Sequence, residues 1–293
     1  MNVSISVLMI TYNGSAFIEE QLRSIDGQSH LSDIFILDDK SQDDFYSQLQ
    51  NTTLTLNNKS TVEQNEENLG VLGNIKRIIA LNHSKQWIAL SDQDDVWKDD
   101  KLYTLAKYLP QNLETPILIY HDAEVIDAAG TVIHPSFWAL LGQDHYEHRL
   151  ETFLYGNFIT GGSSLFNHAL AKYAKDIPED LKTLHDAWLG LCAFCFGQVV
   201  QVNTQLNQYR FHQTNVAFDK DPRSRKELIL KKLTVGKTFL VNEIALVERF
   251  MITYHRQIPE IKEKVLKDFL RLKNQPMFFK RLQKKKILRK FKL

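Results

Sequence analysis

The sequence predicts an α/β domain in which a mostly parallel sheet is flanked by helices. Short apolar runs alternate with segments of helical periodicity over roughly the first 110 residues, which is typical of parallel strands joined by crossover helices. Polar clusters directly follow the apolar runs, at residues 11–13, 38–39, 68–70 and 92–95. Because open α/β sheets bind ligands at the carboxyl ends of their strands, we expect these clusters to meet at one edge.

The first half of the chain is predicted to repeat a strand and a helix. Residues 5–10 form an apolar run, after which Ile18, Leu22 and Ile25 recur at helical spacing, with Ser15 as a candidate N-cap. Further strands are predicted at residues 34–37, 61–64 and 87–90, and further helices at residues 43–50, 71–81 and 99–109. This order favours parallel pairing, since parallel strands need a crossover connection.

The second half is predicted to extend the sheet and then to become helical. A strand at residues 117–121 precedes a hairpin over residues 125–133, with its turn near Gly130. A helix is predicted at residues 185–196 and strands at residues 199–202 and 206–209. After Pro222 the chain is charged and helical in pattern, so we divide it into a domain of residues 1–216 and a helical, basic extension of residues 217–293.

Composition is that of an ordinary globular enzyme. Of the 293 residues, 43% are hydrophobic and 24% are charged, which argues against a disordered chain. The only two cysteines, Cys192 and Cys195, lie in one apolar segment, where buried and inert thiols are expected rather than a redox or zinc pair. No run of about 18 apolar residues and no secretory leader is visible, so we expect a cytoplasmic protein.

The acidic cluster after residues 87–90 is the most informative motif. Asp92, Asp94 and Asp95 stand within four residues at the predicted end of a buried strand. Carboxylates packed this closely repel one another unless a cation lies among them, and a divalent metal that carries a phosphorylated ligand is a common partner. The alternative is a solvated acidic turn or the start of a helix, because aspartate favours both.

Several ordered motifs resemble the inverting family 2 glycosyltransferases of GT-A fold, especially the bacterial branch that adds sugars such as rhamnose to surface polysaccharides. The resemblance covers residues 3–216. It implies transfer of a sugar from a nucleoside-diphosphate donor, a UDP- or dTDP-sugar, to a saccharide or lipid-linked glycan acceptor. The motifs that carry it lie at residues 7–14, 21–25, 90–97, 185–188 and 209–216.

The same resemblance implies a role for each cluster. In the family pattern Asp92 faces the ribose or the sugar, Asp94 contacts Mn²⁺ or Mg²⁺, and Asp186 is the base that takes the proton of the acceptor hydroxyl. Asp186 would lie near the start of a helix whose dipole keeps it ionised, although it could instead only cap that helix. His212 is a third metal or phosphate contact or a structural histidine. The donor-binding positions are Thr11, Tyr12, Asn13, one or both of Asp38 and Asp39, Asn68, and Gly162 in a flexible turn.

Three positions depart from the family pattern. Lys40 stands where glycine usually follows the paired acids, so the turn there must accept a side chain. A bulkier residue often replaces Gly162, and Phe211 stands where glutamine is common. None of these departures removes an expected catalytic carboxylate.

The C-terminal tail differs in charge from the rest of the chain. Ten of the 36 Lys and Arg residues but no acidic residue follow Asp268, which leaves a net charge of −9 for residues 1–268. Basic and apolar residues alternate in this tail, so it is either a peripheral anchor on an anionic membrane or a solvated end. Phe278 and Leu282 fall on a different side of the helical wheel from Ile287 and Phe291.

Other classes of protein fit the sequence less well. Nucleic-acid binding is not expected, because the body is acidic and no recognition motif is present. A sugar-phosphate nucleotidyltransferase would need a Gly-rich, basic loop after the first strand, whereas residues 11–14 contain one glycine and no Lys or Arg. A non-catalytic scaffold that binds nucleotide-sugar or glycan remains an alternative, against which the intact carboxylates argue.

Overall fold

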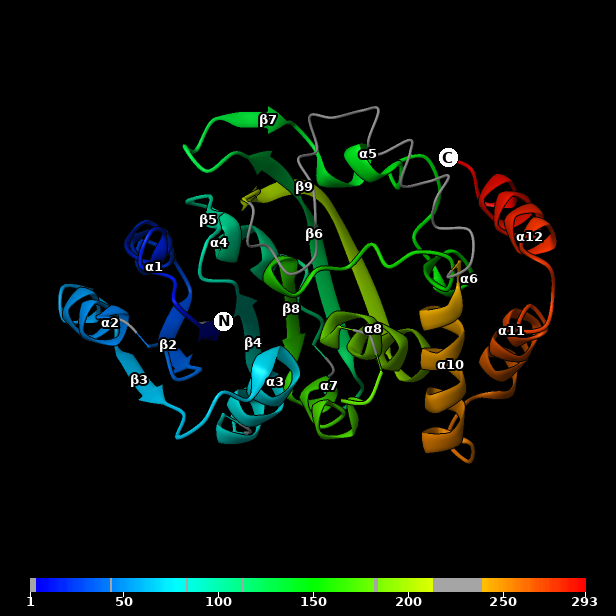
Figure 1. The fold of residues 1–293 in the computed structure, drawn as a ribbon, viewed down its shortest axis with the longest axis horizontal. Coiled ribbons are helices and arrows are strands. Elements are labelled where there is room, and N and C mark those ends of the chain that lie inside the picture. The colour runs from blue at the N-terminus through cyan, green and yellow to red at the C-terminus, as the bar shows by residue number, and fades with distance from the viewer. Residues whose placement is uncertain (1–3, 43, 83, 112, 182–183, 213–238) are drawn as a thin grey trace.

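The computed structural model describes residues 4–42, 44–82, 84–111, 113–181, 184–212 and 239–293. The expected domain boundary at residue 216 therefore lies outside the described residues. Figure 1 shows a central sheet with α1 and α2 at one end of the molecule and α10, α11 and α12 at the other.

The strands in the described part of the chain form one sheet in the order β3-β2-β1-β4-β8-β6-β9-β5, with β7 paired to β6. The pairs β3/β2, β2/β1, β1/β4 and β6/β9 are parallel, whereas β8 runs antiparallel between β4 and β6. The strands are β1 (Ile5–Thr11), β2 (Leu31–Asp38), β3 (Ser60–Gln64), β4 (Trp87–Ser91), β5 (Val96–Trp97), β6 (Ile117–Ile126), β7 (Val132–His134), β8 (Ser164–Asn167) and β9 (Gln198–Arg210).

Helices α1 (Ile18–Asp26), α2 (Phe45–Thr53) and α4 (Lys101–Ala106) cover one face of the sheet. Their apolar residues recur at intervals of three or four, so each helix turns one stripe toward the strands. Leu22, Leu49 and Leu105 are fully buried against β1, β2 and β4 residues of the same apolar cluster. This layer positions the loops that follow β1 and β4.

A thicker layer covers the other face. It contains α3 (Gly70–Leu81), α5 (Phe137–Leu141), α6 (Leu150–Phe153), α7 (His168–Ala171), α8 (His185–Phe196), α10 (Val241–Tyr254), α11 (Glu260–Leu270) and α12 (Met277–Lys290), with single turns η1 (Gly161–Ser163) and η2 (Ala174–Asp176). Helix α8 is apolar on all sides, as expected of a helix enclosed by other elements. Trp188 of α8 packs edge-on against Phe250 of α10, with ring centroids 5.5 Å apart. Helices α8 and α10 thus share one core.

The sheet and most helices confirm the expected α/β fold, with corrections in detail. The helix after β1 begins at Ile18 and has no side-chain cap, so Ser15 is not its N-cap. The strands predicted at residues 199–202 and 206–209 are one strand, β9, because an irregularity of register at His121 and Asp122 lets it follow β6 throughout. Helix α4 ends at Ala106. The sequence did not reveal β5, the antiparallel β8 or the short helices α5, α6 and α7.

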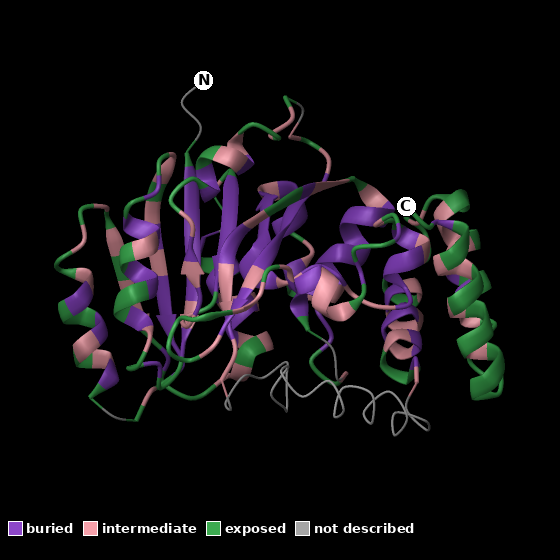
Figure 2. Ribbon diagram, turned by 90° about the horizontal axis from the view of Figure 1, so that it is seen from above, coloured by how far each residue is buried: buried purple, intermediate pink, exposed green. Residues whose placement is uncertain are grey.

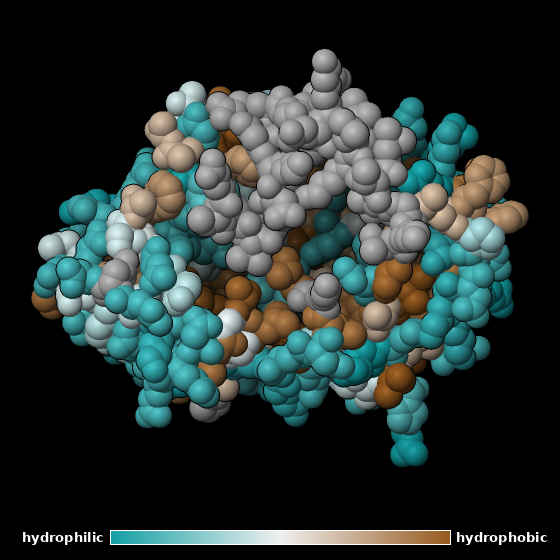
Figure 3. Space-filling view, in the orientation of Figure 1, coloured by the Kyte–Doolittle hydropathy of each residue, from teal (hydrophilic) through white to brown (hydrophobic). Residues whose placement is uncertain are grey.

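The outer surfaces agree with this layering. Figure 2 shows the strands largely buried, while α12 at the edge of the molecule is largely exposed. On the face in Figure 3, hydrophilic residues surround a central group of hydrophobic ones. Both cysteines are free and buried, as expected. Among the described residues, no helix is long and apolar enough to cross a membrane.

Candidate active site

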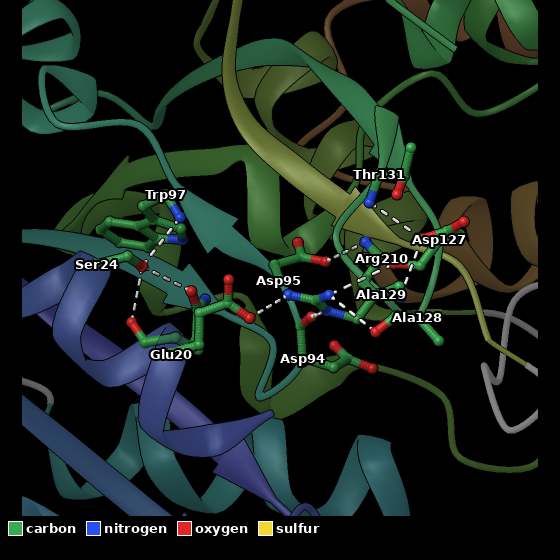
Figure 4. A network of polar contacts seen from close by, with 11 residues as sticks. Glu20, Ser24, Asp94, Asp95, Trp97, Asp127, Ala128, Ala129, Thr131 and Arg210 are labelled. Carbon is green, nitrogen blue, oxygen red and sulfur yellow. Dashed lines mark hydrogen bonds and ion pairs between the residues drawn. The ribbon is translucent and has the colours of Figure 1, made fainter. Parts of the chain in front are cut away.

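The acidic loop between β4 and β5 is held by one buried arginine at the end of β9 (Figure 4). Arg210 is 2% exposed, donates from Nε to the Asp94 carbonyl at 2.8 Å, and from a terminal nitrogen to Glu20 at 2.6 Å. It also donates to the carbonyls of Asp127 and Ala128 in the turn before β7. Guanidinium donors in a rigid fork suit such a multiple contact. The loop is therefore fixed through its backbone, which leaves the Asp92 and Asp94 side chains available for other contacts.

Two buried side chains of opposite charge, Asp95 and Lys101, hold this loop in place. Asp95 is 2% exposed and accepts hydrogen bonds from the Arg210 backbone and from Asn207. Lys101 is fully buried, donates to the Gly162 carbonyl at 2.8 Å and lies 3.7 Å from the centroid of the Trp97 ring. Burial raises the pKa of Asp95 well above its ordinary value and lowers that of Lys101 to about 7. Each group offsets the cost of burying the other.

The Asp92 carboxylate lies against the turn η1. It is accessible to solvent and accepts no hydrogen bond from the described residues. A Cβ atom placed on Gly162 would lie 2.7 Å from Asp92 Oδ2, so only glycine allows this approach. Desolvation by the surrounding protein, followed by the charge of Asp94, raises the pKa of Asp92 above its ordinary value. An acceptor group with no partner among the described residues is available to a ligand hydroxyl.

Asp94 pairs with His212, which follows β9. Asp94 Oδ2 and His212 Nε2 are 2.8 Å apart, and both side chains are about 15% exposed. Within the described ranges, no group of three or more His, Cys, Asp or Glu side chains is arranged to hold a metal ion. Mg²⁺ and Mn²⁺ prefer oxygen ligands, and Mg²⁺ is often bound by one or two carboxylates together with substrate phosphates. Asp94 fits such a cation, with His212 orienting its carboxylate.

The turn η1 also contacts the start of α8. A Cβ atom on Gly161 would lie 2.3 Å from His185 Nε2, so the imidazole packs directly on the turn. His185 is 8% exposed, and neither ring nitrogen has a hydrogen-bond partner in the described part of the chain. Burial lowers the pKa of His185 to about 4, which keeps the ring neutral. Two adjacent glycines thus allow Asp92 and the beginning of α8 to pack closely against one turn.

Asp186 is the second residue of α8 and is 8% exposed. It accepts the Ala187 N–H at 2.6 Å and is hydrogen-bonded to Asn157, and α8 has no side-chain cap. The expectation that the helix dipole keeps Asp186 ionised is incomplete. Burial, followed in part by the charge of Asp92, raises the pKa of Asp186 to about 7. Because Asp92 interacts with both Asp94 and Asp186, the three carboxylates lie in one region.

Asp38 and Asp39, the paired acids after β2, differ in how many of their acceptor positions are filled. Asp38 is fully buried and accepts four hydrogen bonds, one from Thr11, two from Ser41 and one from Gln64. Asp39 accepts three, from the Asn65 side chain and from two backbone N–H groups at the start of α3. A carboxylate has about four acceptor positions. Asp39 therefore keeps one for a ligand, whereas Asp38 keeps none.

The remaining predicted donor-site residues surround these acids. Tyr12 is 43% exposed, and its backbone exchanges two hydrogen bonds with the Gln93 side chain. Asn13 has φ of 48° and accepts from the Gln42 backbone. Asn68 donates to the Asp39 carbonyl at 3.1 Å. Lys40 has φ of 60°, the left-handed region that favours glycine, which agrees with the family's preference at that position.

Sequence reasoning missed Lys101, Asn157 and Arg210 as parts of the site. Lys101 looks like an exposed residue of a helix start, and only folding brings it under Gly162. Asn157 gave no local signal, because it lies in an irregular segment. Arg210 lay inside a motif of the resemblance, which was the one signal that could have identified it.

Comparison with known proteins identifies the family. The sequence model of glycosyl transferase family 2 matches residues 6–170, more than half of the chain. A stretch of 100 residues is 35% identical to the dTDP-rhamnosyl transferase RfbG of Shigella flexneri, covering 32% of this chain and 34% of that protein. The chain thus matches about a third of the length of this curated relative.

Solved structures confirm the GT-A fold. The structure of S. aureus TarS residues 1–349 in complex with UDP has a TM-score of 0.61 at 15% identity, covering 92% of this chain and 71% of that chain. The Pyrobaculum calidifontis mannosyltransferase PcManGT in complex with GDP-Man and Mn²⁺ has a TM-score of 0.53 at 14% identity, covering 97% and 84%. On the match to the family model, this chain belongs to glycosyl transferase family 2.

Proposed function

We propose that the protein transfers a sugar from a nucleoside diphosphate to a saccharide hydroxyl with inversion, in the assembly of a bacterial surface polysaccharide. The observation that carries this proposal is the approach of Asp92 to the two-glycine turn η1, with Asp94 and Asp186 close enough for their charges to interact with that of Asp92. The likeness to a dTDP-rhamnosyl transferase supports a deoxysugar donor such as dTDP-rhamnose, and the likeness to a UDP-bound enzyme supports a pyrimidine nucleotide.

The donor would lie along the carboxyl ends of β1, β2 and β4. Asp39 has one acceptor position for the N–H of a pyrimidine base, while Asp38 holds Thr11 and the following turn in place. Tyr12, Asn13 and Asn68 line this pocket, and Asp92 accepts a hydrogen bond from the ribose or the sugar. A Mn²⁺ or Mg²⁺ ion bound at Asp94 would neutralise the diphosphate and assist its departure.

The acceptor hydroxyl would lose its proton to Asp186. A general base works best when its pKa lies near the working pH, and a pKa of about 7 meets that condition. Asn157 donates to the carboxylate and so fixes its orientation. The neutral, buried His185 beside it excludes water from the turn. Inversion needs a single displacement, so no covalent nucleophile is required.

Replacing Asp186 tests this assignment. Asp186→Asn keeps the size of the side chain and its acceptor for Ala187 but cannot take a proton. We expect nucleotide affinity within about twofold of wild type and turnover lowered by about 10² to 10⁴. The matched control is Asp268→Asn, at a half-exposed position on α11. Wild-type turnover in Asp186→Asn would contradict the assigned base.

Replacing Asp94 tests the metal site without an activity assay. Asp94→Ala removes the carboxylate next to His212, so Mn²⁺ should no longer strengthen the binding of UDP or dTDP in isothermal titration. The same variant should bind the nucleoside uridine as wild type does. An unchanged effect of Mn²⁺ would show that the cation is held elsewhere.

Helix α12 is the proposed contact with an anionic membrane. Ile287 and Leu288 pack against the core and Phe291 is 9% exposed, whereas Phe278, Phe279 and Leu282 are 66%, 54% and 47% exposed. Figure 3 shows hydrophobic residues beside hydrophilic ones over α12. Helical spacing adds the exposed Lys285, Lys286 and Arg289 to this outer face. The two sides of the helical wheel thus have different surroundings. The inner side packs against the core, and the outer side carries aromatic and basic side chains.

Point substitutions test this contact better than deletion of residues 276–293, because deletion would uncover the core around Phe291. Lys285→Gln with Lys286→Gln should weaken binding to vesicles of anionic phospholipid by about thirtyfold, at about 1 kcal/mol for each cation. Ile261→Ser with Lys264→Gln on α11 is the control, since both residues are also exposed. Equal vesicle binding by both double variants would exclude this surface.

A further inference from the structure

A second pocket, of about 520 Å³, opens beside the sheet. It is formed by the middle of β6 and β9, by the segment from Ser136 to His148, and by Leu293. None of Asp92, Asp94 and Asp186 lines it. Pockets that bind small molecules commonly enclose about 300 to 1,000 Å³, so the volume is that of a ligand site.

The walls of this pocket are held by buried hydrogen bonds. Asp122 is 3% exposed and accepts from the Ser136 hydroxyl at 2.6 Å, from the Trp138 backbone at 3.0 Å and from Gln205 at 2.9 Å. Trp138 donates from its indole to the Phe158 carbonyl. The lining is therefore preformed, which lowers the entropic cost of binding a ligand.

The C-terminal segment closes one side of the pocket. Tyr146 forms a β-bridge with Lys292, the Glu147 N–H donates to the Phe291 carbonyl at 2.7 Å, and the Leu293 N–H donates to the His145 carbonyl. Figure 1 shows this end of the chain beside α5 and α6. Parts of the chain that are far apart in sequence thus contribute to one hollow.

The chemistry of the lining selects for neutral, hydroxyl-rich ligands. It includes the amides of Gln143, Gln201 and Asn203, the exposed carboxylates of Asp144 and Glu147, and the rings of Trp138, Tyr146 and His148, but no Lys or Arg. The lining itself has no Lys or Arg to bind a phosphate, and the carboxylate of Glu147 already pairs with Arg149 at 3.2 Å, so nucleotides and phosphates are disfavoured. Amides and carboxylates exchange hydrogen bonds with sugar hydroxyls, and aromatic rings cover their apolar C–H faces.

One buried acceptor in the wall has no hydrogen-bond partner among the described residues. Gln143 is 8% exposed, its Nε2 donates to the Asn157 carbonyl at 3.0 Å, and its Oε1 accepts no hydrogen bond from those residues. The Oε1 atom is itself enclosed, so a ligand hydroxyl reaches it only when the Gln143 side chain turns toward the hollow. The Tyr146 hydroxyl likewise has no hydrogen bond to any described residue, and it is available to the same ligand.

A single residue, Asn157, links the pocket to the proposed base, Asp186. Asn157 accepts from Gln143 on the pocket side through its carbonyl, and its side chain is hydrogen-bonded to Asp186 on the other side. We propose that this pocket binds a sugar unit of the acceptor glycan, next to the unit whose hydroxyl is glycosylated. This inference rests on the proposed function, because it presumes a saccharide acceptor.

Filling the pocket tests the inference. Gln201→Trp places a large side chain in the hollow, and Gln198→Trp, on the same strand at an exposed position outside it, is the matched control. The probes are short neutral oligosaccharides of rhamnose, glucose and N-acetylglucosamine, observed by saturation-transfer difference NMR with UDP present. We expect wild type and Gln198→Trp to bind at least one probe, and Gln201→Trp to bind it at least tenfold more weakly.

Further variants and a separate assay keep the result interpretable. Should Gln201→Trp not fold, Gln201→Ala together with Tyr146→Phe should still weaken binding of the probe about tenfold, at about 1 kcal/mol or less for each hydrogen bond lost. Hydrolysis of UDP- and dTDP-sugars by wild type is measured in parallel. A protein that hydrolyses a donor but binds no probe, or binds it equally after Gln201→Trp, overturns the pocket assignment and leaves the proposed function standing. A protein that binds a probe in the pocket but never uses a donor overturns the proposed function instead.

Discussion

Substituting Gly162 should damage donor chemistry while sparing the fold. In Gly162→Ala the new Cβ would lie 2.7 Å from Asp92 Oδ2 and 3.3 Å from Asp95 Oδ2, and an ordinary contact begins near 3.4 Å. Asp92 is the flexible partner, because its carboxylate is exposed to solvent and carries no hydrogen bond from the described residues. We therefore expect the Asp92 carboxylate to move by about 0.7 Å.

The kinetic cost of this shift can be estimated. A misplacement of about 1 Å at a reacting centre can lower the rate by about 10², so a shift of about 0.7 Å should lower kcat/KM by about tenfold to a hundredfold. This corresponds to about 1.4–2.7 kcal/mol of transition-state stabilisation. The free energy of unfolding should change by less than about 1 kcal/mol, because Asp92 can rotate toward solvent.

Release of nucleoside diphosphate at limiting donor measures kcat/KM, and urea denaturation measures the free energy of unfolding. Gly27→Ala is the matched control, because its nearest neighbour would lie 3.9 Å away and its φ is −74°. If Gly162→Ala folds with wild-type stability and keeps the wild-type kcat/KM, the contact between Asp92 and the turn η1 does not position the donor.

Three further predictions follow from single side chains. Lys40→Gly should raise the free energy of unfolding by about 1 kcal/mol, because φ there is 60°. The control Lys172→Gly, at an exposed position with φ of −58°, should lower the free energy of unfolding by a similar amount. Urea denaturation of both variants measures these changes. Transfer to an acceptor should rise about tenfold per pH unit below pH 7 and level off above it, because Asp186 must lose its proton to act and its pKa is about 7; a flat profile from pH 5 to 8 would contradict that role. Lys101→Met should destabilise the fold by about 3 kcal/mol, since it leaves buried Asp95 without its cation, and an unfolding midpoint equal to that of wild type would refute the pairing.

The parallel half of the sheet could be predicted because local sequence determines it. Strands β1 and β4 are apolar runs buried on both faces, and each ends at a polar residue that marks the edge of the sheet. Strand β8 was missed because it has four residues, follows two glycines, and owes its antiparallel direction to β4 and β6, from which it is separated in sequence. Short-range periodicity carries no information about such pairing.

The sequence revealed the acidic residues of the site but not the residues that hold them in place. Asp92 and Asp94 stand out because carboxylates seldom cluster after a buried strand. Lys101 and Arg210 are ordinary cations until folding buries them, and the four hydrogen-bond donors to Asp38 come from three separate segments. The pKa of Asp186 also depends on burial by distant residues, so the helix dipole alone gave an incomplete estimate of its ionisation.

The clamp formed by Arg210 has a consequence for biosynthesis. Its guanidinium joins α1, the loop after β4 and the turn before β7, and its partner Glu20 lies 190 positions earlier in the chain. A nascent polypeptide lacks this tie until the last residue of β9 has been synthesised, so α1 and the acidic loop are joined through Arg210 only after the described strands are all complete.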